Sequence, residues 1–125
     1  MKCEFGKGTY FIGDICYALK ESYYDMIWGE EYGYENGVFK IGKDKFVVAN
    51  TAFGDGCFKG TDDREYGVDA GVIGVVPKKL WGPKEELSLG GGRVVRVKNK
   101  LVFKTDERGL FEINIDGKDI QIDTR

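Results

Sequence analysis

The sequence contains no histidine, only two prolines and three cysteines among its 125 residues. Histidine is the usual general base near neutral pH and the commonest zinc ligand. Its absence excludes hydrolase machinery that pairs a serine or cysteine nucleophile with histidine, so any catalysis would use carboxylates, tyrosine, lysine, a thiol or a metal. No apolar run reaches the roughly 20 residues of a membrane-spanning helix, and MKCEFGKGTY lacks the apolar centre of a secretory signal. We therefore expect a cytoplasmic protein with no membrane partner.

The three cysteines are Cys3, Cys16 and Cys57. An odd number of cysteines in a chain without an export signal argues against a disulfide framework, so we expect reduced thiols. Cys16 and Cys57 each follow an aspartate by two residues, but zinc sites usually place cysteines in close pairs, and these two stand alone. We predict that both pack into the hydrophobic core, as unpaired cysteines commonly do.

Glycine is abundant, with 19 residues, and the apolar residues form short alternating runs separated by Gly, Asp and Asn. This pattern is typical of antiparallel sheets. We predict a mainly β fold for residues 1–125, a single-domain antiparallel β barrel or sandwich with one packed α-helix and a C-terminal β meander. The predicted strands cover residues 8–13, 38–41, 45–52, 65–69, 72–77, 93–98, 101–105, 110–115 and 119–123.

Gly, Asn and Asp between predicted strands indicate tight hairpins at residues 42–44, 99–100, 106–109 and 116–118. The helix is predicted over residues 18–28, where apolar side chains recur at helical spacing. Residues 77–87 predict one or two helical turns. Residues 88–92, SLGGG, read as a flexible connector.

Charge is unevenly distributed near the C-terminus. Five basic residues and no acid lie between Arg93 and Lys104, whereas six acids and three bases follow from Thr105 onward. In LFEINID the acids alternate with apolar residues, which places them on the solvent face of a strand. We interpret the two segments as neighbouring hairpins that pair their charges across strands, and nucleic acid is not an expected partner.

Three aspartates stand beside or near glycine at the ends of apolar runs: Asp14, Asp55 and Asp69. Two interpretations remain open. Each carboxylate could accept backbone N–H groups of its own turn. Alternatively, the three could converge with the acids of TDDRE and recruit magnesium, calcium or manganese. We expect no cofactor under the first interpretation and a divalent cation under the second.

Aromatic residues crowd the predicted helix and the segment after it: Tyr23, Tyr24, Trp28, Tyr32 and Tyr34. One apolar stripe cannot bury all of them. Those that reach the surface would make rigid binding anchors, and the competing interpretation is that they cap an open end of the β structure.

The segments GTYFIGDICYAL, VANTAFGDGCF and YGVDAGVIGVVP, with DIQIDT near the end, resemble a family of small uncharacterised proteins of bacteriophages and bacteria. Its pattern is a Gly-Asp-Pro-Cys-Tyr turn, a Gly-Asp-Gly turn and a Val-Asp-Ala/Ser-Gly strand. The resemblance covers residues 8–77 well and the C-terminal meander loosely, and Ile15 stands where the pattern has proline. It implies a phage or mobile-element origin and emphasises the three aspartates, but it implies no activity.

The leading functional hypothesis is a non-enzymatic binding protein that recognises a host protein or small ligand through an aromatic and acidic surface, with no catalytic residues. Its predicted ligand-binding residues are Asp14, Asp55, Asp69, Trp28 and Tyr32. One alternative is a divalent-metal-dependent phosphoester hydrolase, in which the three aspartates hold the metal and Lys59 or Arg64 stabilises the transition state. Another is a structural or oligomeric module that pairs through an exposed β edge.

Overall fold

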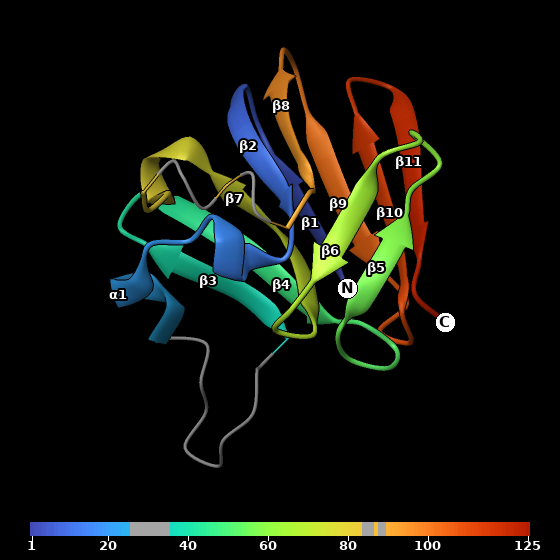
Figure 1. Ribbon diagram of the computed structural model, residues 1–125. Coiled ribbons are helices and arrows are strands. Elements are labelled where there is room, and N and C mark those ends of the chain that lie inside the picture. The colour runs from blue at the N-terminus through green and yellow to red at the C-terminus, as the bar shows by residue number, and fades with distance from the viewer. Residues whose placement is uncertain (26–35, 84–86, 88–89) are drawn as a thin grey trace.

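The computed structural model describes residues 1–25, 36–83, 87 and 90–125 (Figure 1). This part of the chain is mainly β with antiparallel pairing, as predicted. The strands are β1 (Lys2–Phe5), β2 (Gly8–Gly13), β3 (Gly37–Ile41), β4 (Asp44–Asn50), β5 (Gly56–Lys59), β6 (Glu65–Val68), β7 (Val72–Pro77), β8 (Arg93–Val97), β9 (Leu101–Thr105), β10 (Leu110–Ile115) and β11 (Lys118–Asp123). The helical elements are η1 (Ile15–Tyr17), α1 (Glu21–Tyr24) and η3 (Lys78–Leu80).

Two sheets enclose the main core. A four-stranded sheet has the order β1-β9-β10-β11, a five-stranded sheet has the order β3-β4-β7-β2-β8, and β5 and β6 form a separate two-stranded ribbon (Figure 1). Apolar side chains of both sheets and of the ribbon form one buried cluster, which includes Tyr66, Val75, Phe103 and Phe111. The architecture is therefore a β sandwich, since the open edges of both sheets exclude a closed barrel.

The five-stranded sheet is buried on both faces along its inner strands β4, β7 and β2, whereas its edge strands β3 and β8 are partly exposed. Its second face packs on a smaller apolar cluster, where Phe11, Phe46 and Val76 meet Ile15 of η1 and Leu80 of η3. Burial on both faces explains why VIGVVP in β7 is a continuous apolar run rather than an alternating one.

Two strands were absent from the sequence-based prediction. In β1, Cys3 and Phe5 are buried while Lys2 and Glu4 are exposed, so this short strand does carry an alternating signal. β5 has no such pattern, because its residues are exposed except for the half-buried Phe58. Its strand conformation depends on pairing with β6.

The prediction of a hairpin at residues 99–100 is wrong. β8 pairs with β2 in one sheet, and β9 pairs with β1 and β10 in the other. The chain therefore crosses from one sheet to the other at this point. Val97 faces the shared core from the five-stranded sheet, and Leu101 faces it from the four-stranded sheet. The other three predicted hairpins are confirmed, as β3–β4, β9–β10 and β10–β11.

The helix is shorter than predicted. Ala18 and Leu19 precede it, Leu19 forms an isolated bridge with Trp81, and α1 begins only at Glu21. The backbone N–H of Lys20 donates to the carbonyl of Leu80, a tertiary contact that holds the chain out of helical conformation there. Residues 26–28 of the predicted helix lie outside the described residues.

The flexible connector predicted at residues 88–92 is also incorrect where the structure describes it. The carbonyl of Gly90 accepts the N–H of Gly67 at 2.6 Å, and the N–H of Gly92 donates to the carbonyl of Glu65 at 2.9 Å. These glycines extend the β5–β6 ribbon by backbone pairing. Only glycine fits at 91, because a Cβ there would lie 2.6 Å from the carbonyl oxygen of Glu65.

All three cysteines are free, as expected, but the core packing predicted for Cys16 and Cys57 is wrong for Cys57 and only partial for Cys16. Cys57 is exposed and Cys16 is half-buried, whereas Cys3 is buried. Cys57 lies on β5, and no other part of the described structure covers most of the side chains of this strand. The residues around Cys57 in the sequence therefore did not indicate that it is exposed.

The crossing between the sheets depends on Asp116. Its carboxylate accepts the backbone N–H groups of Lys98, Asn99 and Lys100, and these hydrogen bonds lower its pKa below the ordinary value of 3.8. Asp116→Asn keeps a residue that tolerates the positive φ of 51° but weakens the acceptor. We expect a lower melting temperature at pH 7.

A carboxyl with a lowered folded-state pKa stabilises the fold above its unfolded-state pKa, and that contribution is lost as pH falls through the folded-state value. The difference in melting temperature between wild type and Asp116→Asn should therefore shrink below about pH 3.8. Asp63→Asn is the matched control, since Asp63 also has a positive φ of 64° but its carboxylate accepts no backbone hydrogen bond from the described residues. An equal effect of both substitutions would contradict the role of Asp116.

Candidate functional site

Asp14 is buried at the end of β2, with 1% of its surface exposed. One carboxylate oxygen accepts the N–H of Cys16 at 2.9 Å, and the other accepts the N–H groups of Asp69 and Ala70 at 2.8 and 2.7 Å. Burial raises the pKa of Asp14, and these hydrogen bonds oppose that rise. Asp14 thus joins β2, the cap of η1 and the turn before β7.

The thiol of Cys16 lies beside this carboxylate. Burial raises the pKa of Cys16 strongly, and the negative charge of Asp14 raises it further. Since the thiolate is the nucleophilic form of cysteine, the thiol is unsuited to nucleophilic chemistry near neutral pH.

Asp55 and Asp69 are both exposed, and their turns lie side by side. The N–H of Thr51 donates to the carbonyl of Gly71 at 3.0 Å, and a Cβ on Gly71 would lie 3.4 Å from the Cα of Gly54. The structure therefore brings together the backbone turns that carry the predicted aspartates. Of the three predicted aspartates, Asp14 alone is buried, and Asp55 and Asp69 are exposed.

The acids of TDDRE belong to the opposite end of the ribbon. Asp62 accepts the hydroxyl of Tyr66 at 2.7 Å and forms an ion pair with Arg93 at 3.2 Å. Burial raises the pKa of Tyr66, and the hydrogen bond to Asp62 adds to this effect. Among the described residues, no group of three or more His, Cys, Asp or Glu side chains could hold a metal ion.

The predicted aromatic anchors Trp28 and Tyr32 lie outside the described residues, as does Tyr34. Tyr23 and Tyr24 are half-buried and pack against the second apolar cluster. These two tyrosines therefore fit the interpretation that aromatic side chains cover the β structure.

Phe53 is the aromatic residue that the sequence analysis missed, and 82% of its surface is exposed. Its loop is held on both sides: the N–H of Ala52 donates to the Thr124 hydroxyl at 3.0 Å, and the Thr51 hydroxyl donates to the carbonyl of Gly54. The sequence did carry a sign of this exposure, because Phe53 lies beyond the end of a buried strand and directly before the Gly54-Asp55 turn. We call Phe53, Asp55 and Asp69 the acidic turn surface.

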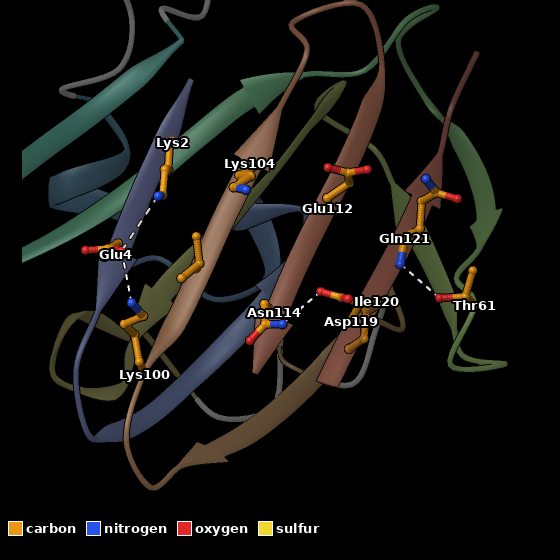
Figure 2. A pocket seen from close by; sticks show the side chains of 11 residues that line it. Lys2, Glu4, Thr61, Lys100, Lys104, Glu112, Asn114, Asp119, Ile120 and Gln121 are labelled. Atoms are coloured by element: carbon orange, nitrogen blue, oxygen red, sulfur yellow. Dashed lines mark hydrogen bonds and ion pairs between the residues drawn. The ribbon is translucent and has the colours of Figure 1, made fainter. Parts of the chain in front are cut away.

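A polar hollow of about 730 Å³ covers the outer face of the four-stranded sheet (Figure 2). Its charges pair with one another: Glu4 lies 3.3 Å from Lys100 and 3.9 Å from Lys2, and Lys104 stands opposite Glu112. Lys104 faces Glu112 across β9 and β10, as the predicted charge pairing requires, whereas Lys100 pairs with Glu4 of β1, which lies outside the acidic segment of the prediction. The side chain of Asn114 donates to Asp119 at 2.8 Å, so the hollow leaves little unbalanced charge for a ligand.

In the described parts of the chain, no helix combines the length and apolar character needed to cross a bilayer. No protein-family model, curated protein or solved structure matches the chain. The resemblance of its aspartate turns to phage and bacterial proteins stays a prediction.

The unequal roles of the aspartates can be tested by stability. In Asp14→Asn the amide nitrogen would face a buried N–H group, so the free energy of unfolding should fall by about 1–3 kcal/mol. Asp55→Asn is the matched control and should change it by less than about 0.5 kcal/mol, since Asp55 is exposed. Chemical denaturation of the three proteins measures both values, and equal losses would refute this assignment.

Proposed function

We propose that this protein is a non-enzymatic binding protein that recognises a partner protein through the acidic turn surface. The observation that carries the proposal is the 82% exposure of Phe53 on a loop whose backbone is held by hydrogen bonds. A large apolar side chain in water gains free energy when a partner covers it. Aromatic residues are common among the side chains that contribute most to protein interfaces.

The loop geometry favours recognition because little conformational freedom would be lost on binding. Thr124 anchors Ala52 and also donates its hydroxyl to the carbonyl of Gly109 at 2.7 Å. A Cβ on Gly109 would lie 2.6 Å from the Cβ of Ala52, so the loop sits tightly on the β9–β10 turn. Phe53 is therefore presented from a packed base.

The charge of the surface suggests the chemistry of the partner. In the part of the chain that the structure describes, neither Asp55 nor Asp69 forms an ion pair. Two unneutralised carboxylates, one two residues after the exposed Phe53 and one on the adjoining turn, suit an apolar slot flanked by lysine or arginine. The phage resemblance makes a bacterial host protein the first candidate.

Hydrolysis has weaker support than binding. The hydrolase hypothesis uses Asp14 as a metal ligand, yet both of its oxygens accept backbone N–H groups within 2.9 Å. Lys59, one of its candidate cations, lies 3.7 Å from Asp63 rather than beside the aspartate turns. The β-edge hypothesis has no comparable observation in its favour.

The test uses immobilised wild-type protein and its Phe53→Ser and Asp55→Asn/Asp69→Asn variants to capture proteins from a bacterial lysate. A partner held by wild type should be lost with both variants, and its purified form should bind Phe53→Ser at least about tenfold more weakly. Val38→Ser is the control, because Val38 is another exposed apolar residue, 41% exposed, on the edge strand β3. Capture of the same proteins by Phe53→Ser, or of none by wild type, would contradict the proposal.

A further inference from the structure

We propose a second binding site, for a small organic oxyanion such as a phosphate monoester with an apolar group. It is an open cavity of about 410 Å³ lined by Arg64, Arg93, Gly91, Gly92, Phe11, Leu87 and Val94. Arg64 adjoins the β5–β6 connection, at the opposite end of the ribbon from Asp55 and Asp69. The site is thus separate from the acidic turn surface and does not depend on the proposed function.

Both guanidinium groups are held in position by the protein. Nη1 of Arg93 lies 3.2 Å from Oδ2 of Asp62, and that same oxygen accepts the hydroxyl of the buried Tyr66. Nε and Nη2 of Arg64 donate to the carbonyl of Gly92, each at 3.3 Å. Side chains fixed in this way lose little freedom when a ligand binds.

The contacts leave donors free. A guanidinium has five N–H donors, and Arg93 uses one nitrogen in its contact with Asp62. In the described structure, Arg64 has no further partner beyond Gly92 and carries no ion pair. Asp62 balances one of the two positive charges, so the described lining of the cavity retains an excess positive charge in a chain of net charge −2.

Unused guanidinium donors are suited to phosphate and carboxylate oxygens, which accept paired hydrogen bonds from arginine. The backbone wall depends on glycine, because a Cβ on Gly92 would lie 2.8 Å from the carbonyl oxygen of Ile12. Its φ of 80° also favours glycine. A larger residue would displace the wall that adjoins both arginines.

The remaining wall is apolar. Val94 is 50% exposed, Leu87 is half-buried, and the almost fully buried Phe11 lies opposite Val94 in the β2–β8 register. The described lining contains no carboxylate, thiol or hydroxyl that could act as a nucleophile or general base. The combination of cationic and apolar walls therefore fits binding of an anion with an apolar group, without a chemical step.

Phenyl phosphate is the probe, titrated by calorimetry and by thermal melting at 0.15 M NaCl. We expect saturable binding and a rising melting temperature, with weaker binding of inorganic phosphate and of phenol, because each offers only part of the ligand. Arg64→Gln should weaken phenyl phosphate binding about tenfold or more. Arg108→Gln removes the same charge from the exposed β9–β10 turn and should leave the affinity unchanged.

A second variant keeps the test independent of Arg64. Val94→Glu places a carboxylate at an already exposed wall position and should abolish binding while the melting temperature without ligand stays near that of wild type. Absence of saturable binding, equal losses in Arg64→Gln and Arg108→Gln, or equal affinity for phenol would overturn the proposal. Tighter binding of a short single-stranded oligonucleotide than of phenyl phosphate would also overturn it, in favour of a nucleic-acid surface.

Discussion

The buried carboxylate of Asp14 connects its own segment, β2 and η1, to a turn that lies 55 residues further along the chain. It accepts N–H groups from η1 and from the turn at Asp69 and Ala70, and so fixes β2 against the start of β7. Burial raises the pKa of Asp14 above its ordinary value of 3.8. The free energy of unfolding therefore falls as pH rises from 3.8 through the pKa of the folded state, because the buried carboxyl loses its proton there. The fold tolerates this cost because the N–H groups would otherwise be buried without an acceptor.

That constraint separates two sequence motifs that read alike. Gly13-Asp14-Ile15-Cys16-Tyr17 places its aspartate inside the protein, whereas Gly54-Asp55-Gly56-Cys57-Phe58 places its aspartate in water and leads into an exposed strand. The first motif organises the turn, and the second presents a surface beside Phe53. The surface proposed for partner binding therefore rests on the aspartate that does not hold the fold together.

The β5–β6 ribbon gives the two proposed sites a common support. At one end its turns adjoin Phe53 and Asp55, and at the other end Asp62 joins Tyr66 to Arg93 of the five-stranded sheet. Backbone pairing with Gly90 and Gly92 adds to this attachment. The ribbon is short, so tertiary contacts at both ends determine where the acidic turn surface and the arginine cavity lie.

Local alternation and turn chemistry were sufficient to predict the β class, most strand positions and three hairpins, because side-chain periodicity and glycine or aspartate turns act over a few residues. The sequence also identified Asp14, Asp55 and Asp69 as special positions. Only the tertiary structure decided which of them is buried, that residues 99–100 cross between sheets, and that Arg64 and Arg93 converge. Burial and convergence depend on how the sheets pack against each other. The contacts between sheets join residues that are far apart in the chain, and the local sequence pattern around either residue does not reveal its partner.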